Sequence, residues 1–120
     1  MNDDRLYLTH ILERVERIKS YTRGGEAAFL ADTMAKDAVV CNFEVIGEAS
    51  KRISQRTKDL SPYIAWREMA AFRDVLVHHY EGILAERVWE AVAQDLPKLE
   101  TQIKALLMIV DGEIERNADG

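Results

Sequence analysis

The chain has 120 residues, of which 48% are hydrophobic and 31% charged, and its formal net charge is −5. This length allows one domain with a modest core, and the composition is that of a folded globular protein rather than a disordered chain. An acidic balance argues against a general nucleic-acid binder, which is usually basic, but it leaves room for a local cationic cleft.

The chain shows no sign of a membrane segment, a disulfide or a metal site. No apolar run approaches the roughly 20 residues needed to span a bilayer, and the acidic N-terminus lacks the basic start and apolar core of a signal peptide. The single Cys41 excludes an internal disulfide and fits a reducing compartment. One cysteine and three histidines give no convincing zinc site, so we expect a cytoplasmic protein without metal or cofactor.

The first predicted helix runs from about Asp3 to Tyr21. His10 lies beside its apolar stripe and is expected to be a structural or surface residue. Gly24 and Gly25 end the helix, and a linker follows. The stripe has the i, i+3, i+4 spacing and consists of Leu8, Ile11, Leu12, Val15 and Ile18.

The second predicted helix begins near Thr33, with Asp32 or Thr33 as its N-cap, and ends near Ile53. Because it is apolar on two sides, we expect it to lie inside a bundle or at a subunit interface. Asn42 and Glu48 lie beside the stripes and are read first as packing residues. The stripes are Met34, Ala38, Cys41, Val45 and Ala49, and then Val39, Phe43 and Ile46.

Four basic residues follow this helix: Lys51, Arg52, Arg56 and Lys58. They form either a solvated helix end that complements the helix dipole or a patch that steers phosphate toward a cleft. Ser61 and Pro62 are expected to cap and begin the next helix, which starts there or a few residues later.

That third helix carries an arginine in the middle of its apolar face. At about 100° per residue, Arg73 lies within about 60° of every residue of the apolar stripe. A guanidinium stays charged, so its burial requires a carboxylate, a carbonyl, a second subunit or a phosphate; Glu48 is a candidate partner. His78 and His79 lie five and six residues after Arg73 in the sequence. The stripe consists of Trp66, Met69, Ala70, Leu76, Val77 and Tyr80.

The remaining chain is expected to form one more long helix, from about Leu84 or Ala85 to about Ile114. Gly82 closes the preceding helix or its turn, and Pro97 predicts a kink or break near residues 95–97. The end of the chain, 116–120, is expected to be a frayed tail. No segment alternates like a strand, so residues 1–120 are predicted to form one all-α, up-and-down bundle of four to five helices.

Arg73, His78 and Tyr80 suit RNA cleavage without a metal. A base must take the proton of the ribose 2′-hydroxyl, an acid must protonate the leaving 5′-oxygen, and a cation must stabilise the phosphorane. An unperturbed imidazole, with a pKa of about 6.5, suits both proton transfers, and arginine suits the phosphate. Arg-x4-His alone is a weak pattern, and a structural network at a helix end remains the alternative.

Helix geometry restricts how these residues can meet. On an unbroken helix His78 lies about 140° from Arg73, whereas Tyr80 lies only about 20° from it. Either the helix distorts before His78, or two subunits complete a composite cleft. Together with the two-sided second helix, this favours a homodimer.

The segment from Arg73 to Tyr80 matches an Arg-x4-His-x-Tyr signature, and the chain resembles the HepT-like toxins of the HEPN superfamily. The resemblance extends to residues 42–49, 66–70 and 88–97, and it covers nearly the whole chain. Asp74 stands where HEPN motifs carry a polar residue after the arginine.

The resemblance implies a metal-independent endoribonuclease toxin that acts on RNA, not DNA, as a homodimer whose motifs line a shared cleft. Arg73 would stabilise the scissile phosphate and His78 would transfer protons, with Asp74, His79 and Glu48 in supporting roles. The implied partner is a MntA-type nucleotidyltransferase antitoxin, which would neutralise the toxin by adding AMP to the motif tyrosine, here Tyr80.

Two other functions fit the same residues. A non-catalytic HEPN binding module would dock onto a minimal nucleotidyltransferase and cut nothing, since fold alone does not fix function. A structural helical dimer would use Arg73 only as an ion pair across its interface.

Overall fold

The computed structural model of the protein describes residues 2–79 and 83–119, which contain helices and no strand. The predicted all-α bundle is therefore confirmed. None of the described helices is both long and apolar enough to cross a bilayer. In chain order the elements are α1 (Asn2–Tyr21), α2 (Glu26–Ala31), α3 (Thr33–Arg52), α4 (Gln55–Leu60), α5 (Trp66–His79), α6 (Ala85–Glu90), the π-helical segment η2 (Ala91–Asp95) and α7 (Leu96–Asp119).

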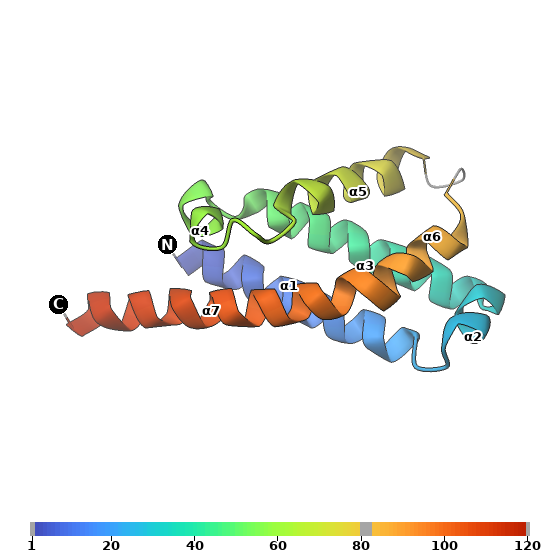
Figure 1. Cartoon of the computed structure of the whole chain (residues 1–120), viewed down its shortest axis with the longest axis horizontal. Coiled ribbons are helices and arrows are strands. Elements are labelled where there is room, and N and C mark those ends of the chain that lie inside the picture. The colour runs from blue at the N-terminus through green and yellow to red at the C-terminus, as the bar shows by residue number, and fades with distance from the viewer. Residues whose placement is uncertain (1, 80–82, 120) are drawn as a thin grey trace.

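The long helices α1, α3, α5 and α7 form an elongated bundle, 54 × 27 × 20 Å in extent (Figure 1). Helix α3 packs against both α1 and α5, and α1 also packs against α7. The C-terminal end of α7 projects beyond the rest of the bundle (Figure 1). The two-sided packing of α3 is what its two apolar stripes predicted.

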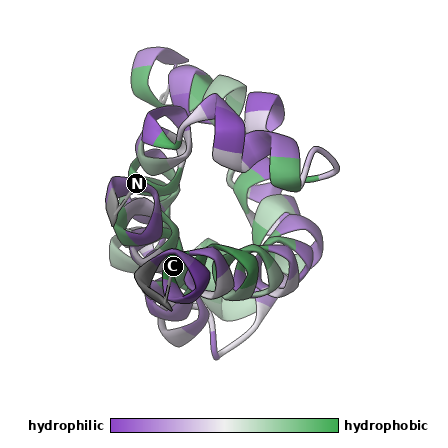
Figure 2. Ribbon diagram, turned by 90° about the vertical axis from the view of Figure 1, so that its left-hand side faces the viewer, coloured by the Kyte–Doolittle hydropathy of each residue, from purple (hydrophilic) through white to green (hydrophobic). Residues whose placement is uncertain are grey.

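The core is formed by the apolar stripes of the long helices, and hydrophobic and hydrophilic residues alternate along each helix in the end-on view (Figure 2). Burial of each large side chain contributes about 1.5–3 kcal/mol relative to exposure. The fully buried apolar side chains include Leu8, Ile11, Val15 and Ile18 of α1, Val39 of α3, Leu76 of α5 and Ile103 and Leu106 of α7.

Helix α3 begins as predicted, because the Asp32 side chain accepts a hydrogen bond from the Ala35 amide at 3.1 Å. Asn42 is a packing residue as expected: it is buried and donates to the Ala38 carbonyl at 2.7 Å. Of the two placements expected for the stripe through Met34 and Cys41, a bundle interior or a subunit interface, the interior does not hold for these two residues, since Met34 is 82% exposed and Cys41 is exposed. This part of α3 therefore leaves an apolar strip on the surface.

Two short helices, α2 and α4, were not predicted, because six residues are too few to show a helical period. Helix α4 is fixed by Asp4 of α1, which is buried. The Asp4 carboxylate accepts hydrogen bonds from the Ser54 amide at 2.9 Å, the Ser54 hydroxyl at 2.5 Å and the Thr57 hydroxyl at 2.6 Å. Burial alone would raise the pKa of Asp4, but these hydrogen bonds outweigh it and lower that pKa.

The third helix starts a few residues after Ser61, within the predicted range, but the roles expected for Ser61 and Pro62 at its start were wrong. Ser61 is the C-cap of α4, and α5 begins only at Trp66. The Trp66 indole donates to the Ser61 carbonyl at 3.2 Å, which ties the start of α5 to the end of α4. The helix predicted from Leu84 or Ala85 does begin at Ala85, with Leu84 as its N-cap.

The interruption expected near Pro97 is a π-helical segment rather than a break. The Leu96 amide donates to the Ala91 carbonyl, an i to i−5 bond, and the helix continues into α7. Because Pro97 has no N–H, it cannot supply the next bond of a regular α-helix. Helix α7 then runs to Asp119, where a frayed tail was expected from Arg116.

Candidate active site

Arg73 lies on the side of α5 that faces α3, and its side chain is 27% exposed. Its Nε atom lies 3.4 Å from Glu48 Oε2, and its NH1 atom donates to Asp74 Oδ1 at 3.2 Å. The expected ion pair with Glu48 is therefore present within one chain. Nε is nevertheless buried and donates no hydrogen bond to a described residue, so a strong donor remains unsatisfied at this site.

Gly47 sets the distance between α3 and α5 at this point. A β-carbon added to Gly47 would meet Cβ and Cγ of Arg73 at less than 3.0 Å and the Met69 carbonyl oxygen at 3.0 Å. Only glycine therefore allows this approach. The signal that could have identified Gly47 is a glycine inside a strongly helical pattern.

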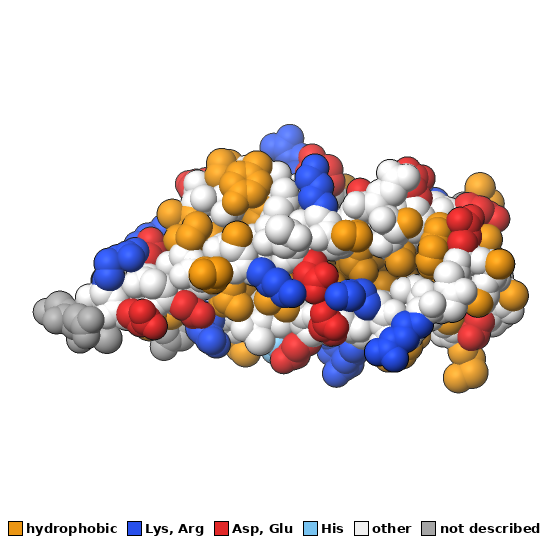
Figure 3. All heavy atoms as spheres, turned by 60° about the horizontal axis from the view of Figure 1, so that its bottom comes forward, with side chains coloured by type: hydrophobic (Ala, Val, Ile, Leu, Met, Phe, Trp, Pro, Cys, Tyr) orange, Lys and Arg blue, Asp and Glu red, His pale blue; other side chains and the backbone are white. Residues whose placement is uncertain are grey.

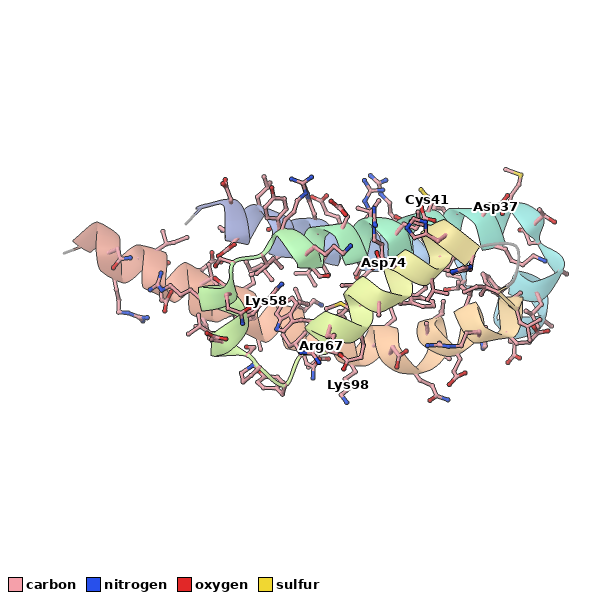
Figure 4. All side chains as sticks on the ribbon, turned by 90° about the horizontal axis from the view of Figure 1, so that it is seen from above. Asp37, Cys41, Lys58, Arg67, Asp74 and Lys98 are labelled. Atoms are coloured by element: carbon pink, nitrogen blue, oxygen red, sulfur yellow. The ribbon has the colours of Figure 1, made fainter. Side chains whose placement is uncertain are left out.

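The cations of α3 and α5 alternate with carboxylates across the surface between the two helices. Lys51 donates to Asp74 Oδ1 at 3.0 Å, Asp74 contacts Arg73, Arg73 contacts Glu48, and Glu48 contacts Arg52 Nε at 3.4 Å. Hydrogen bonds from Lys51, and secondarily from Arg73, lower the pKa of Asp74. Figure 4 shows Asp74 between α3 and α5.

The predicted basic cluster is divided between two places. Lys51 and Arg52 join the network around Arg73. Arg56 instead lies 3.8 Å from Glu113 of α7, and the Lys58 ammonium lies 5.9 Å from the centre of the Trp66 ring. Only half of the cluster therefore stands beside the predicted site.

His78 and His79 are exposed in the last turn of α5 and make no hydrogen bond or ion pair with the described residues. Helix α5 is continuous through His79, so a distortion before His78, the first of the two alternatives, does not occur. By helical periodicity, His78 and Arg73 then lie about 140° apart. The predicted modification site, Tyr80, and the predicted helix end, Gly82, lie outside the described residues.

A cavity of about 330 Å³ lies between α3, α5 and the segment from α6 to α7. Its apolar wall includes Phe43, Met69 and Phe72, and the Arg87 guanidinium lies 5.0 Å from the centre of the Phe72 ring. Arg73 does not line this cavity, although Gly47 does. The predicted catalytic groups therefore lie outside the cavity.

The described residues contain no group of three or more histidine, cysteine, aspartate or glutamate side chains arranged to hold a metal ion. On the face along which α7 runs, acidic and basic side chains are interspersed rather than separated by sign (Figure 3). That face therefore offers no broad cationic surface, whereas Lys51, Arg52 and Arg73 gather around the contact of α3 and α5.

Comparison with known proteins connects this arrangement to ribonucleases. A protein from Thermococcus cleftensis named "Probable ribonuclease HepT" is 42% identical over 83% of this chain and 92% of its own length. A "Putative RNase" from Caldanaerobacter subterraneus is 33% identical over 89% of this chain and 96% of its own.

A longer relative from Methanocaldococcus jannaschii, named "Gamma-glutamylcyclotransferase and putative RNase", is 36% identical over 91% of this chain, which spans 50% of that protein. No solved structure matches significantly. The model of the family described as "Ribonuclease HepT-like" matches residues 11–106. The chain therefore belongs to the HepT-like ribonuclease family.

Proposed function

We propose that this protein is an endoribonuclease in which Arg73 binds the scissile phosphate and His78 transfers protons. The observation that carries the proposal is the state of Arg73: its guanidinium is held beside α3, partly buried, with one unsatisfied donor. Family membership supports RNA as the substrate.

The reaction follows from the groups present. A base removes the proton of the ribose 2′-hydroxyl, the 2′-oxygen attacks phosphorus, and the bond from phosphorus to the 5′-oxygen breaks. An acid protonates that leaving oxygen, and the Arg73 fork stabilises the charge on the phosphorane oxygens. Histidine and arginine side chains supply these parts, so the proposal includes cleavage without a metal.

The proposal places the complete site in a homodimer. Since α5 is unbroken, Arg73 and His78 of one chain point in different directions, and a second copy supplies the missing partner. The surface formed by α3 and α5 carries the exposed apolar residues Met34 and Val77 together with Cys41. A dimer formed through this surface would bury them and bring two α5 helices together.

We further propose that the protein is the toxin of a toxin–antitoxin pair and that a MntA-type nucleotidyltransferase neutralises it by adding AMP to Tyr80. The sequence spacing of seven residues would place Tyr80 about 20° from Arg73 on a regular helix. An added phosphate there would compete with RNA for the guanidinium. Co-expression with such a partner should add multiples of one adenylyl mass to the intact protein, and Tyr80→Phe should remove the addition.

The test of catalysis is cleavage of single-stranded RNA by the purified protein in the presence of EDTA. Arg73→Ala and His78→Ala should each lower the rate at least about 100-fold, as expected for loss of a charge-stabilising or proton-transfer group. His10→Ala, which changes a histidine on α1, is the matched control. Full activity in both site variants would refute the assigned roles, and activity only with added Mg²⁺ would refute metal independence.

One observation favours a second candidate function, a non-catalytic module that binds a nucleotidyltransferase. Both groups that face the Arg73 guanidinium are carboxylates, Glu48 and Asp74, which is also what a purely structural arginine requires. This alternative predicts a stable complex with the partner and no RNA cleavage under any condition. Expression without the partner would then leave cell growth unaffected.

A further inference from the structure

The two cations nearest Asp74 converge on a single oxygen atom. Lys51 Nζ donates to Asp74 Oδ1 at 3.0 Å, and Arg73 NH1 donates to the same atom at 3.2 Å. Lys51 comes from the end of α3 and Arg73 from the middle of α5, so the two donors meet only because these helices cross closely at Gly47. The position of Oδ1 is therefore a binding position for an anionic oxygen.

The carboxylate that fills this position is held weakly. The side chain of Asp74 is 50% exposed and that of Lys51 is 38% exposed. Exposed ion pairs contribute little to stability, so the Asp74 side chain can turn toward water at small cost. A phosphate oxygen accepts the same charge-assisted hydrogen bonds at the same distances.

We propose that Lys51 binds the scissile phosphate together with Arg73, and that Asp74 occupies the position of a phosphate oxygen while RNA is absent. This inference rests on the proposed ribonuclease function and adds a second phosphate-binding residue to it. Asp74 then acts as an internal competitor of the substrate. RNA must displace it before the two cations can bind the phosphate.

Arg52 provides a matched control for Lys51. It is the next residue of α3 and has the same charge, but it contacts Glu48 and not Asp74. Interactions with Tyr7 of α1, and secondarily with Glu48, raise the pKa of Arg52, and Asp74 is not among the groups that shift it. A general loss of positive charge would affect Lys51→Met and Arg52→Met equally, whereas a phosphate contact would not.

The experiment measures binding of the full-length protein to a fully 2′-O-methylated RNA oligomer, which has no 2′-hydroxyl to attack, at a series of salt concentrations. For a single strand, each phosphate contact contributes about 0.7 to the slope of log Kd against log salt. Lys51→Met should weaken binding about 3- to 10-fold at low salt and lower the slope by about 0.7. Arg52→Met should leave the slope nearly unchanged.

Asp74→Asn should strengthen RNA binding, which is the opposite of the effect expected for Lys51→Met. This change keeps the shape of the side chain and removes the competing charge, so RNA should bind about 3- to 10-fold more tightly at low salt. The gain should disappear when Lys51→Met is added. A merely structural Asp74 would instead give weaker or unchanged binding, and that result overturns the inference. An unchanged slope in Lys51→Met overturns it as well.

The same measurements separate this inference from the proposed function. If the wild-type protein cleaves unmodified RNA while Lys51→Met keeps the full slope, the inference fails and the function stands. If the protein binds the methylated RNA with the expected slopes but cleaves no unmodified RNA, the catalytic proposal fails and Lys51 stands as a phosphate contact. Absence of RNA binding at low salt overturns both.

Discussion

Gly47 of α3 and Arg73 of α5 meet without space for a methyl group between them, and this contact places the guanidinium. The β-carbon that any other residue would add at position 47 would lie within 3.0 Å of the Arg73 side chain and at 3.0 Å from the Met69 carbonyl oxygen. Because the carbonyl belongs to the α5 backbone, the helix itself would have to move. The position of Arg73 over Glu48 therefore depends on a residue that carries no functional group.

We expect Gly47→Ala to destabilise the protein even though alanine favours helix. Overpacking costs about 1–3 kcal/mol and higher helix propensity returns about 0.5–1 kcal/mol, so the net loss should be up to about 2.5 kcal/mol. Gly112→Ala in α7 is the matched control, since its added carbon would be 3.5 Å from the nearest atom, a terminal Arg116 nitrogen. Urea unfolding should show a lower midpoint for the first variant only. Equal midpoints would show that α3 and α5 separate freely.

Mixed dimers should show whether the cleavage site is composite. Arg73→Ala and His78→Ala homodimers should both be inactive. In a dimer that pairs one chain of each kind, one site would keep Arg73 from one chain and His78 from the other. Mixing the two inactive proteins under exchanging conditions should therefore restore roughly a quarter of the wild-type rate. Mixtures that stay inactive, although mass spectrometry shows exchange, would place both residues in a single-chain site.

Cys41 reports on the proposed dimer surface because it is the only cysteine of the chain and is exposed on α3. In Figure 4 it lies on α3 beside α5. Its reaction with a maleimide should slow as protein concentration rises, because dimerisation would cover it. The control is Cys41→Ser combined with Lys104→Cys on α7, whose reaction rate should not depend on concentration. Equal behaviour of the two would exclude the surface of α3 and α5 as the interface.

Asp4 should contribute stability that is lost in acid. Its pKa in the folded protein lies below the ordinary value of 3.8, so the charged form is favoured on folding. The contribution is therefore present above that ordinary value and disappears as pH falls through the folded pKa. At neutral pH, Asp4→Ala should cost about 2–3 kcal/mol, because it leaves the Ser54 and Thr57 donors without their carboxylate.

The measurement for this prediction is urea unfolding between pH 3 and 7. Asp4→Ala should flatten the loss of stability below pH 4 relative to the wild type. The pKa values of Asp74 and Glu100 are also lowered, so part of the acid dependence should remain. Asp3→Ala changes an exposed neighbour and should alter stability by about 0.5 kcal/mol or less. The same acid dependence in the Asp4 variant as in the wild type would contradict the assignment.

Much of the fold could be predicted because the long helices bury continuous apolar stripes. The bounds of α1 and α3 follow from periodicity and from the Asp32 cap. Helix α4 was not predicted because its position depends on Asp4, which is 50 residues or more from its hydrogen-bond partners in the sequence. A local pattern cannot show such a contact, and for the same reason Ser61 was assigned to the wrong helix.

The site could be predicted in part. An arginine inside an apolar stripe required a partner, and Glu48 is one. The sequence could not show that Lys51 reaches Asp74, since this contact depends on how closely α3 and α5 cross. It also left open whether α5 bends before His78, because residues 74–77, Asp-Val-Leu-Val, include no proline or glycine that would force a bend and none that would forbid one.

Helix α5 borders both the Arg73 network and the cavity. Met69 and Phe72, which lie within about one turn before Arg73, line the 330 Å³ cavity, and Gly47 lines the same cavity and contacts the Arg73 side chain. Because the two helices touch at Gly47 with no space to spare, a molecule that widened the cavity would be expected to shift α5 and, with it, the Arg73 guanidinium.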